Sequence, residues 1–198
     1  MGFYQERMLP CLTDLAMRQG RLTPYRSRVV RAATGRVLEI GIGSGLNLPF
    51  YSKGIAQVLG LDPSRKLLEM TRDAATRTSV PLEVIEGSAE DIPIDNRSID
   101  TVVTTWTLCS IREVRDALAE MRRVLKPGGQ LLFVEHGRAP EPRVQWWQDH
   151  LTPIWKHLAG GCHFNRPISE LIQNAGFRIE RLRPKLVTFM YEGSARPH

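Results

Sequence analysis

The feature that most limits the fold of this chain is a run of alternating glycines after a short apolar segment. The run reads Val37-Leu38-Glu39-Ile40-Gly41-Ile42-Gly43-Ser44-Gly45-Leu46-Asn47, and it predicts a buried strand that turns sharply into a helix. Further along, the apolar run Leu59-Gly60-Leu61 ends in the carboxylate of Asp62. A glycine turn lets a ligand approach the backbone, and an acid after the second strand accepts hydrogen bonds from ribose hydroxyls. Together, these features predict an α/β sheet that binds a nucleoside.

The spacing of the glycines indicates which class of nucleoside ligand the loop suits. A dinucleotide fingerprint needs G-x-G-x-x-G, and Leu46 occupies the position of its third glycine. The sequence contains no G-x-x-x-x-G-K-[ST] phosphate loop. The run is instead G-x-G-x-G, which suits a ligand that needs a close backbone approach more than an anion-binding loop. Taken alone, it is also compatible with a plain glycine-rich turn.

Three further motifs follow in order along the chain. Gly87-Ser88-Ala89-Glu90-Asp91-Ile92-Pro93 comes after an apolar run, Ile99–Thr105 reads as a β-branched central strand, and Arg122–Gly129 ends a helix before the strand Gln130–Glu135. With the glycine run, they resemble the motifs of the class I S-adenosylmethionine-dependent methyltransferases over about residues 35–137. The resemblance implies S-adenosylmethionine as the cofactor.

The alternation of strands and helices, together with the resemblance, predicts an α/β fold. We expect a Rossmann-like doubly wound sheet, mostly parallel, with an antiparallel C-terminal strand pair. The expected strands are 37–41, 57–62, 82–86, 99–105, 130–135, 177–182 and 186–191. The expected helices are 5–20, 24–33, 46–53, 64–77, 112–125, 142–158 and 167–175. Residues 1–198 should form a single methyltransferase domain, in which residues 1–34 are a helical N-terminal extension or lid.

The resemblance also assigns roles in cofactor binding. It places the three glycines against the amino-acid part of the cofactor, Asp62 against the ribose and Thr105 beneath the sulfonium. Ser88 and Ala89 would lie at the adenine edge. Glu39 would brace the glycine loop or the methionyl end, and a purely structural carboxylate is the alternative. The full predicted set is Glu39, Gly41, Gly43, Gly45, Asn47, Asp62, Pro63, Ser88, Ala89 and Thr105.

The substrate half of the sequence carries a second resemblance. Leu108-Cys109-Ser110 follows the fourth strand, Glu135-His136 follows the fifth, and Trp155-Lys156-His157 precedes Gly161-Cys162. This pattern is similar to the mammalian methyltransferase-like thiol S-methyltransferases, and it implies a small thiol or sulfide as methyl acceptor. Those proteins begin with a hydrophobic membrane anchor that this sequence lacks, so membrane residence is not carried over.

Two other functions remain open on the sequence alone. One is N- or C-methylation of a lipid head group or a quinone precursor, because the glycine, G-S-A-E-D-I-P and L-K-P-G-G motifs are shared with such enzymes. The other is a non-catalytic module that binds the cofactor and methylates nothing. The intact glycine loop and Asp62 argue against a module of this kind.

Two histidines are candidate catalytic residues. His136 follows a strand end at the predicted crevice, and His157 lies in the segment shared with the thiol enzymes. Either imidazole is suited to accept the proton of a thiol near neutral pH, and hydrogen bonding to the backbone is the structural alternative. Cys109 is interpreted as a pocket-lining residue, because methyl transfer from a sulfonium needs no covalent enzyme intermediate. No metal site is expected from His157, Cys162 and His163, since no second cysteine lies nearby in the sequence.

The expected helix 142–158 shows two neighbouring stripes of side chains. Val144, Trp147, Leu151, Ile154 and Leu158 recur at intervals of three and four, which predicts a face packed on the core. The adjacent stripe contains Trp146 and His157, and we expect it to face the ligand.

Composition limits the partners and the compartment. The net charge is +6, but the arginines are scattered without a basic and aromatic cluster, so we expect a small-molecule substrate and no nucleic acid. A weak peripheral membrane contact through the N-terminal helix is compatible with this charge. The three cysteines are widely spaced, and we find no apolar run that reads as a signal peptide or a membrane span. We therefore expect a cytoplasmic protein.

Overall fold

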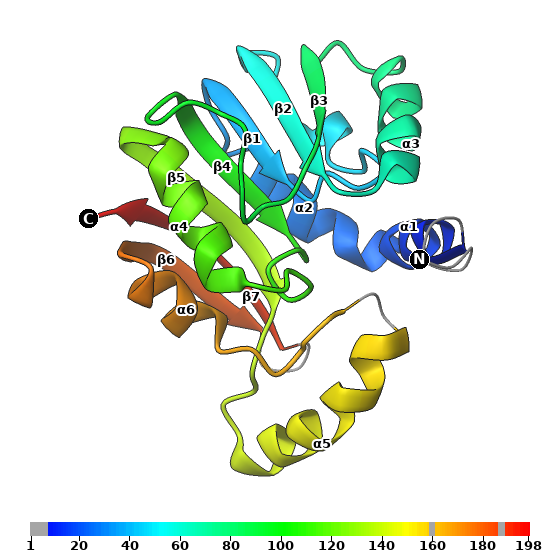
Figure 1. Ribbon diagram of the computed structural model, residues 1–198, viewed down its shortest axis with the longest axis vertical. Coiled ribbons are helices and arrows are strands. Elements are labelled where there is room, and N and C mark those ends of the chain that lie inside the picture. Colours follow the sequence, from blue (N-terminus) through cyan, green and yellow to red (C-terminus); the bar gives the residue numbers. More distant parts are fainter. Residues whose placement is uncertain (1–7, 159–160, 186–188) are drawn as a thin grey trace.

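The computed structural model describes residues 8–158, 161–185 and 189–198, apart from the side chains of 157, 158, 184 and 185. Its centre is a seven-stranded sheet with the order β3-β2-β1-β4-β5-β7-β6 (Figure 1). Strands β1 to β5 run parallel, and β7 is antiparallel to both β5 and β6. The predicted fold class is confirmed. The strands are β1 Arg36–Ile40, β2 Gln57–Asp62, β3 Leu82–Glu86, β4 Ile99–Thr105, β5 Leu125–His136, β6 Phe177–Lys185 and β7 Met190–Pro197.

The register of the parallel strands brings their carboxyl ends to one edge. Ile40 of β1 pairs with Leu61 of β2 and with Thr104 of β4. The residues that directly follow these pairs are Gly41, Asp62 and Thr105. Because the carboxyl ends of the parallel strands lie at one edge of the sheet, the glycine loop, Asp62 and the end of β4 lie next to one another.

Helices cover both faces of the sheet. In Figure 1, α4 and α6 lie in front of the sheet and α2 lies behind it. Among the described residues, no helix has both the length and the apolar character needed to cross a membrane. The helices are α1 Leu9–Met17, α2 Thr23–Val30, α3 Arg65–Ala75, α4 Val114–Val124, α5 Pro142–Leu158 and α6 Ile168–Asn174, with 3₁₀ turns η2 Gly20–Leu22 and η3 Leu48–Phe50.

Two apolar cores result from the alternation of side chains along the strands. Leu38 and Ile40 of β1 belong to one buried cluster, together with residues of α4 and α6. Val37 belongs to the second cluster, together with residues of α2 and α3. Successive residues of a strand point to opposite faces, so a strand that is apolar throughout is buried on both sides.

Several expected elements have other bounds in the structure: β5 begins at Leu125 rather than at 130, and α1 and α2 end at Met17 and Val30 rather than at 20 and 33. The helix predicted at 46–53 is only the 3₁₀ turn η3, because Tyr51 already has extended backbone angles and directs its hydroxyl to Glu39. The last strand is Met190–Pro197 rather than 186–191, and residues 186–188 lie outside the described part of the chain. The prediction of an antiparallel pair was right, but the prediction of its second strand was shifted toward the N-terminus.

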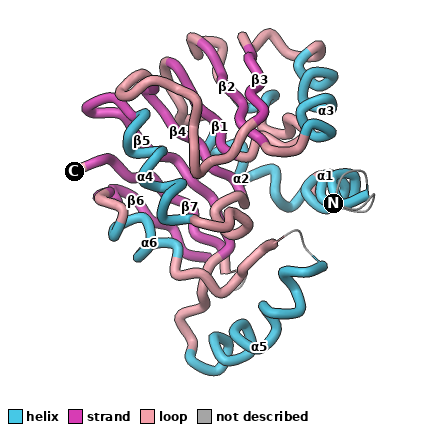
Figure 2. Tube along the Cα trace, viewed as in Figure 1, coloured by secondary structure: helices cyan, strands magenta, loops and turns pink. Residues whose placement is uncertain are grey.

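Helix α5 was predicted correctly in extent and wrongly in orientation. Figures 1 and 2 show α5 set apart from the sheet beyond the end of β5. The stripe predicted to face the core is exposed: Trp147 is 58% exposed and Ile154 is 64% exposed. Among the side chains of α5 that the structure describes, the buried ones are polar, namely Gln148 and Thr152. Gln148 donates to the carbonyls of Gly137 and Phe164 and accepts from Ala139 N, so α5 is anchored to the loops by an amide.

Substitution of Gly193 tests the packing around β7. A Cβ at Gly193 would collide with the carbonyl oxygen of Arg181 and lie 2.6 Å from Phe133 Cζ. We expect Gly193→Ala to lower the free energy of unfolding by about 1–3 kcal/mol, as overpacking does in a close-packed interior. Urea denaturation measures this change. Gly54→Ala is the matched control, because a Cβ there meets no atom within 4 Å; it should stay within about 0.5 kcal/mol of the wild type. Equal stability of the two variants would contradict the packing described.

Candidate functional site

A cleft of about 480 Å³ opens at the carboxyl ends of β1, β2 and β4. Ligands of open α/β sheets bind at this edge. Three members of the predicted cofactor set, Glu39, Gly45 and Asn47, do not line the cleft. The other members do: Gly41, Gly43, Asp62, Pro63, Ser88, Ala89 and Thr105.

The glycine loop is held open to the cleft by Gly43. Its N–H donates to Asp62 Oδ2 at 3.0 Å, and its carbonyl accepts from Thr71 Oγ1 of α3. Gly43 has a φ of +61°, and a Cβ there would meet only Gly41 O, at 3.9 Å. A side chain at this position would therefore combine backbone strain with intrusion into the cleft.

Asp62 holds the loop and still faces the cleft. Its Oδ1 accepts from Ser64 N at 2.8 Å, and its Oδ2 accepts from Gly43 N. Burial raises the pKa of the carboxyl, and these two backbone hydrogen bonds act in the opposite direction. Since a carboxylate oxygen has two lone pairs, each oxygen keeps acceptor capacity for a ligand hydroxyl.

Glu39 and Asn47 lie behind the cleft in a buried hydrogen-bond network. Glu39 accepts from Asn47 Nδ2 at 2.7 Å and from the Tyr51 hydroxyl at 2.7 Å. Asn47 Nδ2 also donates to Thr105 Oγ1 at 3.0 Å. Burial raises the pKa of Glu39 to about 7, despite these donors. This geometry corresponds to the bracing role considered for Glu39, because the carboxylate ties the segment after the glycine loop to β1, and Asn47 ties the same segment to the end of β4.

Gly45 serves the turn rather than the cleft. A Cβ there would lie 3.0 Å from Leu48 Cδ1 and 3.2 Å from Ala74 Cβ. The position therefore lets the loop pack closely on α3.

The N-terminal helices supply cleft residues that the sequence analysis missed. Asp14 of α1 accepts from Ser44 Oγ at 2.5 Å, and Arg18 pairs with the same carboxylate. Arg26 of α2 donates to Asn47 Oδ1 at 2.9 Å and lies 4.7 Å from the centroid of the Trp106 ring. Asp14 and Arg26 both line the cleft. They belong to no recognised motif, and no local pattern in the sequence indicates these partners.

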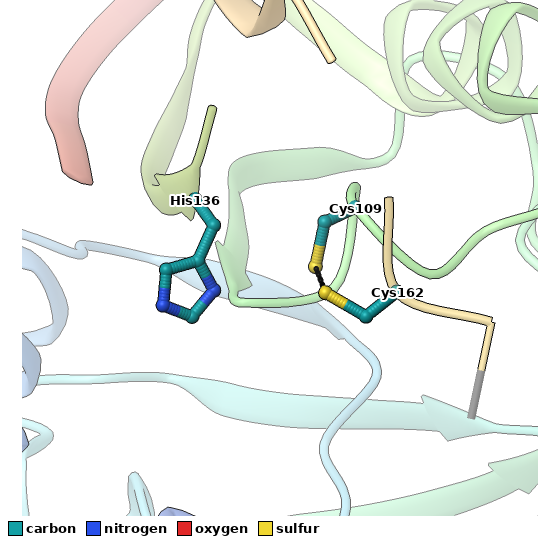
Figure 3. A group of neighbouring side chains, drawn as sticks. All are labelled: Cys109, His136 and Cys162. Atoms are coloured by element: carbon teal, nitrogen blue, oxygen red, sulfur yellow. Dashed lines mark hydrogen bonds between the residues drawn. The ribbon is translucent and has the colours of Figure 1, made fainter. Parts of the chain in front are cut away.

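A second group of side chains gathers beside the cleft, and we call Cys109, His136 and Cys162 the sulfur–imidazole corner. Cys109 lies in the loop after β4, His136 ends β5, and Cys162 follows α5 (Figure 3). The two Sγ atoms are 3.5 Å apart, and the ligand atoms of all three residues lie within 4.8 Å of one another. Figure 3 shows one nitrogen of the His136 ring turned toward the sulfurs. The corner thus joins three segments that are distant in sequence.

The corner favours ionisation of one thiol over the other. The pKa of Cys162 is lowered, because Cys109 and then His136 stabilise its thiolate. The pKa of the buried Cys109 is raised, first by its hydrogen bond with Cys162 and then by burial. The first proton lost from this pair therefore comes from Cys162.

Hydrogen bonds fix the two cysteine loops against each other. His163 N donates to the carbonyl of Cys109 at 2.7 Å, and the Arg166 guanidinium donates to the carbonyl of Leu108. Thr107 N donates to the buried carboxylate of Glu135 at 3.1 Å. The position of the corner is therefore set by the backbone and not by the cysteines alone.

The corner adjoins the cleft through the loop after β4. Trp106, Thr107 and Ser110 line the cleft, and the Trp106 ring centroid lies 6.4 Å from that of His136. The interpretation of Cys109 as a pocket-lining residue was wrong: it is 1% exposed and does not line the cleft, whereas its neighbour Ser110 does.

The structure describes the side chain of only one of the two predicted catalytic histidines. His136 lies at the predicted strand end, beside the cleft. His157 lies in α5, and its side chain is outside the described part of the structure. The proton-acceptor role of either residue stays a prediction.

Comparison with known proteins places the chain among methyltransferases. A family profile described as a methyltransferase domain matches residues 38–133. Thiol S-methyltransferase TMT1B of Homo sapiens is 38% identical over a match that covers 78% of this chain and 66% of that protein. TMT1A of Homo sapiens, also a thiol S-methyltransferase, is 31% identical, with 82% of this chain and 67% of that protein covered. The chain therefore spans no more than about two thirds of the length of these curated relatives.

Other similar proteins act on different acceptors or show the fold alone. Phosphatidylethanolamine N-methyltransferase of Cereibacter sphaeroides is 35% identical over 54% of this chain and 53% of that protein. The solved structure of an S-adenosylmethionine-dependent methyltransferase from Aquifex aeolicus has a TM-score of 0.69 at 18% identity. The match covers 94% of this chain and 97% of the Aquifex protein chain.

The pH dependence of stability tests the environment of Glu39. Its pKa is raised from 4.5 to about 7 by burial, so the folded protein holds this proton more tightly than the unfolded chain does. Glu39 should therefore make the protein less stable as pH rises from about 4.5 to 7, by about 3 kcal/mol in total, since one pKa unit corresponds to about 1.4 kcal/mol. Glu39→Gln should lose this part of the pH dependence.

Urea denaturation at several pH values between 5 and 7.5 measures the effect. The exposed carboxylate Glu83 gives a matched control, Glu83→Gln, which should retain the wild-type pH dependence. A Glu39→Gln variant whose stability changes in parallel with the wild type would refute the burial described for Glu39.

Proposed function

This chain belongs to the class I S-adenosylmethionine-dependent methyltransferases, and we propose that it methylates the sulfur of a small thiol or of sulfide. The observation that carries the proposal is the sulfur–imidazole corner, which adjoins the cleft at the end of β4. The thiol S-methyltransferases among its relatives support the same acceptor.

The cleft suits S-adenosylmethionine, the cofactor of this family. The space in front of Gly43 would receive the amino-acid part, Asp62 would accept from the ribose hydroxyls, and Ser88 with Ala89 would border the adenine. Thr105 would lie beneath the sulfonium, held by Asn47. When bound, the cofactor supplies a methyl group on a sulfonium. A nucleophile takes this methyl group, and the electron pair of the carbon–sulfur bond stays on the cofactor sulfur.

The acceptor thiol would enter from the side of Trp106 and the corner. A thiol reacts as its thiolate, so the site must remove its proton and hold the sulfur near the methyl group. His136 is the described side chain best placed to take part in both tasks. The exclusion of water would fall to residues 1–34, which we propose act as a lid, because Asp14, Met17 and Arg26 line the cleft.

A lipid head group is the second candidate acceptor. The match to a phosphatidylethanolamine N-methyltransferase favours it, but that match covers only 54% of this chain.

Substitution of Gly43 tests the position of the cofactor. We expect Gly43→Val to weaken binding of S-adenosylmethionine by about 5–150-fold, because its side chain would enter the cleft, and steric overlap of this kind costs about 1–3 kcal/mol. Titration calorimetry measures the affinity, and circular dichroism checks the fold. Gly54→Val, at an open position outside the cleft, should bind as the wild type does. A folded Gly43→Val with normal affinity would place the cofactor elsewhere.

A panel of acceptors tests the proposed substrate class. Radiolabelled S-adenosylmethionine is incubated with sulfide, ethanethiol, phosphatidylethanolamine vesicles and a quinol. We expect label only in the sulfide and thiol products, with a rate that rises with pH toward the pKa of the thiol as the thiolate accumulates. Labelling confined to phosphatidylethanolamine or to the quinol would disprove the thiol proposal, while methyl transfer as the activity would still hold.

A further inference from the structure

The sulfur–imidazole corner carries the donor set of a soft metal site. Cysteine sulfur and histidine nitrogen are the ligands that Zn²⁺ takes in proteins, and two cysteines with one histidine is a known catalytic combination. The metal set rejected in the sequence analysis was His157, Cys162 and His163. The structure groups Cys162 instead with Cys109 and His136, from two loops that the sequence does not connect.

The distances suit a tetrahedral ion. With Zn–S bonds of about 2.3 Å and Zn–N bonds of about 2.0 Å, tetrahedral geometry places two sulfurs roughly 3.8 Å apart and a sulfur and a nitrogen roughly 3.5 Å apart. The observed Sγ–Sγ distance is 3.5 Å, and no pair of the three ligand atoms is more than 4.8 Å apart. Side-chain rotations that move the donor atoms by about 1 Å would bring all three donors to bonding distance of one ion.

We propose that Cys109, His136 and Cys162 bind one Zn²⁺ and leave its fourth position to the sulfur of the acceptor thiol. The proposal rests on the proposed function, since it explains how this chain would select and ionise a thiol. Catalytic zinc sites keep such an open position, whereas structural sites close it with a fourth protein ligand.

The surroundings of the corner fit an open site rather than a closed one. Cys162 and His136 are only partly buried, whereas Cys109 is buried. Trp106, Thr107 and Ser110 connect the corner to the cleft. A thiolate held at the corner would therefore reach the cofactor past the loop that carries these three residues.

The hydrogen bonds of the two loops would preorganise the ligands. The carbonyls of Leu108 and Cys109 are held by Arg166 and by His163 N. Supports of this kind keep ligating residues in place, and their loss lowers metal affinity by about 10–100-fold. The backbone thus holds both cysteine loops in position before any ion binds.

The chemistry balances without a further reactant. When the thiol sulfur bonds to the metal, its S–H bond breaks and the proton goes to solvent, which leaves the electron pair on sulfur. That pair forms the new bond to the methyl carbon. The carbon–sulfonium bond breaks, its electron pair stays with the departing sulfur, and the thioether leaves the metal as a weaker ligand. His136 then acts as a ligand, which replaces the general-base role predicted for it.

Cobalt substitution tests the metal site without reference to activity. The full chain is purified with a phosphine reductant, its free thiols are counted, and it is titrated with Co²⁺. We expect one Co²⁺ per chain, with the sulfur-to-cobalt charge-transfer absorption and the intense visible bands of a tetrahedral ion. Cys162→Ala and His136→Gln should weaken Co²⁺ binding by more than about 100-fold. Loss of a residue that only supports a metal ligand weakens binding by about 10–100-fold, and loss of a ligand itself should cost more.

Matched controls separate the corner from other residues of the same type. Cys11 is exposed and outside the corner, and His198 is the exposed C-terminal residue. Cys11→Ala and His198→Gln should bind Co²⁺ as the wild type does. Failure of the fully reduced wild type to bind Co²⁺, or equal binding by all variants, would overturn the proposal.

Addition of a thiol tests the open position. Ethanethiol should shift the charge-transfer absorption of the Co²⁺ protein, because a third sulfur joins the metal, while ethanol should leave the spectrum unchanged. An unchanged spectrum with ethanethiol would show that the thiol does not bind the ion, and the proposal would fail.

Removal of the metal distinguishes this proposal from the proposed function. Chelator-treated protein should still bind S-adenosylmethionine but lose thiol methylation, and Zn²⁺ should restore it. Full thiol methylation by metal-free protein would overturn the metal site and leave the thiol function standing. A metal-loaded protein whose spectrum responds to thiols, but which methylates none of them, would support the metal site and refute the proposed function.

Discussion

The hydrogen bond from Gly43 N to Asp62 is the interaction on which the site depends. Strands β1 and β2 run in parallel register, so the loop after β1 lies against the end of β2. Gly41 N and Ile42 N donate to Leu61 O, and Gly43 N then donates to the Asp62 carboxylate. These hydrogen bonds pair the N–H groups on the inner side of the loop, and the outer side of the loop faces the cleft. The same carboxylate keeps acceptor capacity for a ligand, so we propose that one side chain sets both the loop geometry and the binding of the ligand.

The fold and the floor of the cleft were predictable from the sequence because their signals are local. An apolar run followed by glycines indicates a strand and a tight turn, and the parallel order of strands brings Asp62 and Thr105 to the same edge without knowledge of any tertiary contact. The helix predicted after the glycine loop is wrong for a local cause that pattern rules do not include. Tyr51 leaves the helical conformation to reach Glu39, and this shortens the predicted helix to one 3₁₀ turn.

The other half of the site depends on contacts that the sequence does not reveal. Asp14 reaches Ser44 and Arg26 reaches Asn47 across many residues, and neither pair belongs to a motif. Helical periodicity in α5 identified an apolar stripe but not its surroundings, and the buried face is the one that carries Gln148. The sulfur–imidazole corner was missed for the same reason: Cys109 and Cys162 become neighbours only when the loop after α5 packs on the loop after β4.

Titration calorimetry with S-adenosylmethionine on an Asp62→Ala variant tests the central claim most directly. The claim is that one carboxylate both fixes the glycine loop and binds the cofactor. It predicts a loss of about 1–3 kcal/mol in binding free energy, or about 5–150-fold in Kd, while circular dichroism shows a folded protein. The exposed Asp73 of α3 provides the matched variant Asp73→Ala, which should bind as the wild type does. A folded Asp62→Ala protein with the affinity of the Asp73→Ala control would contradict the account.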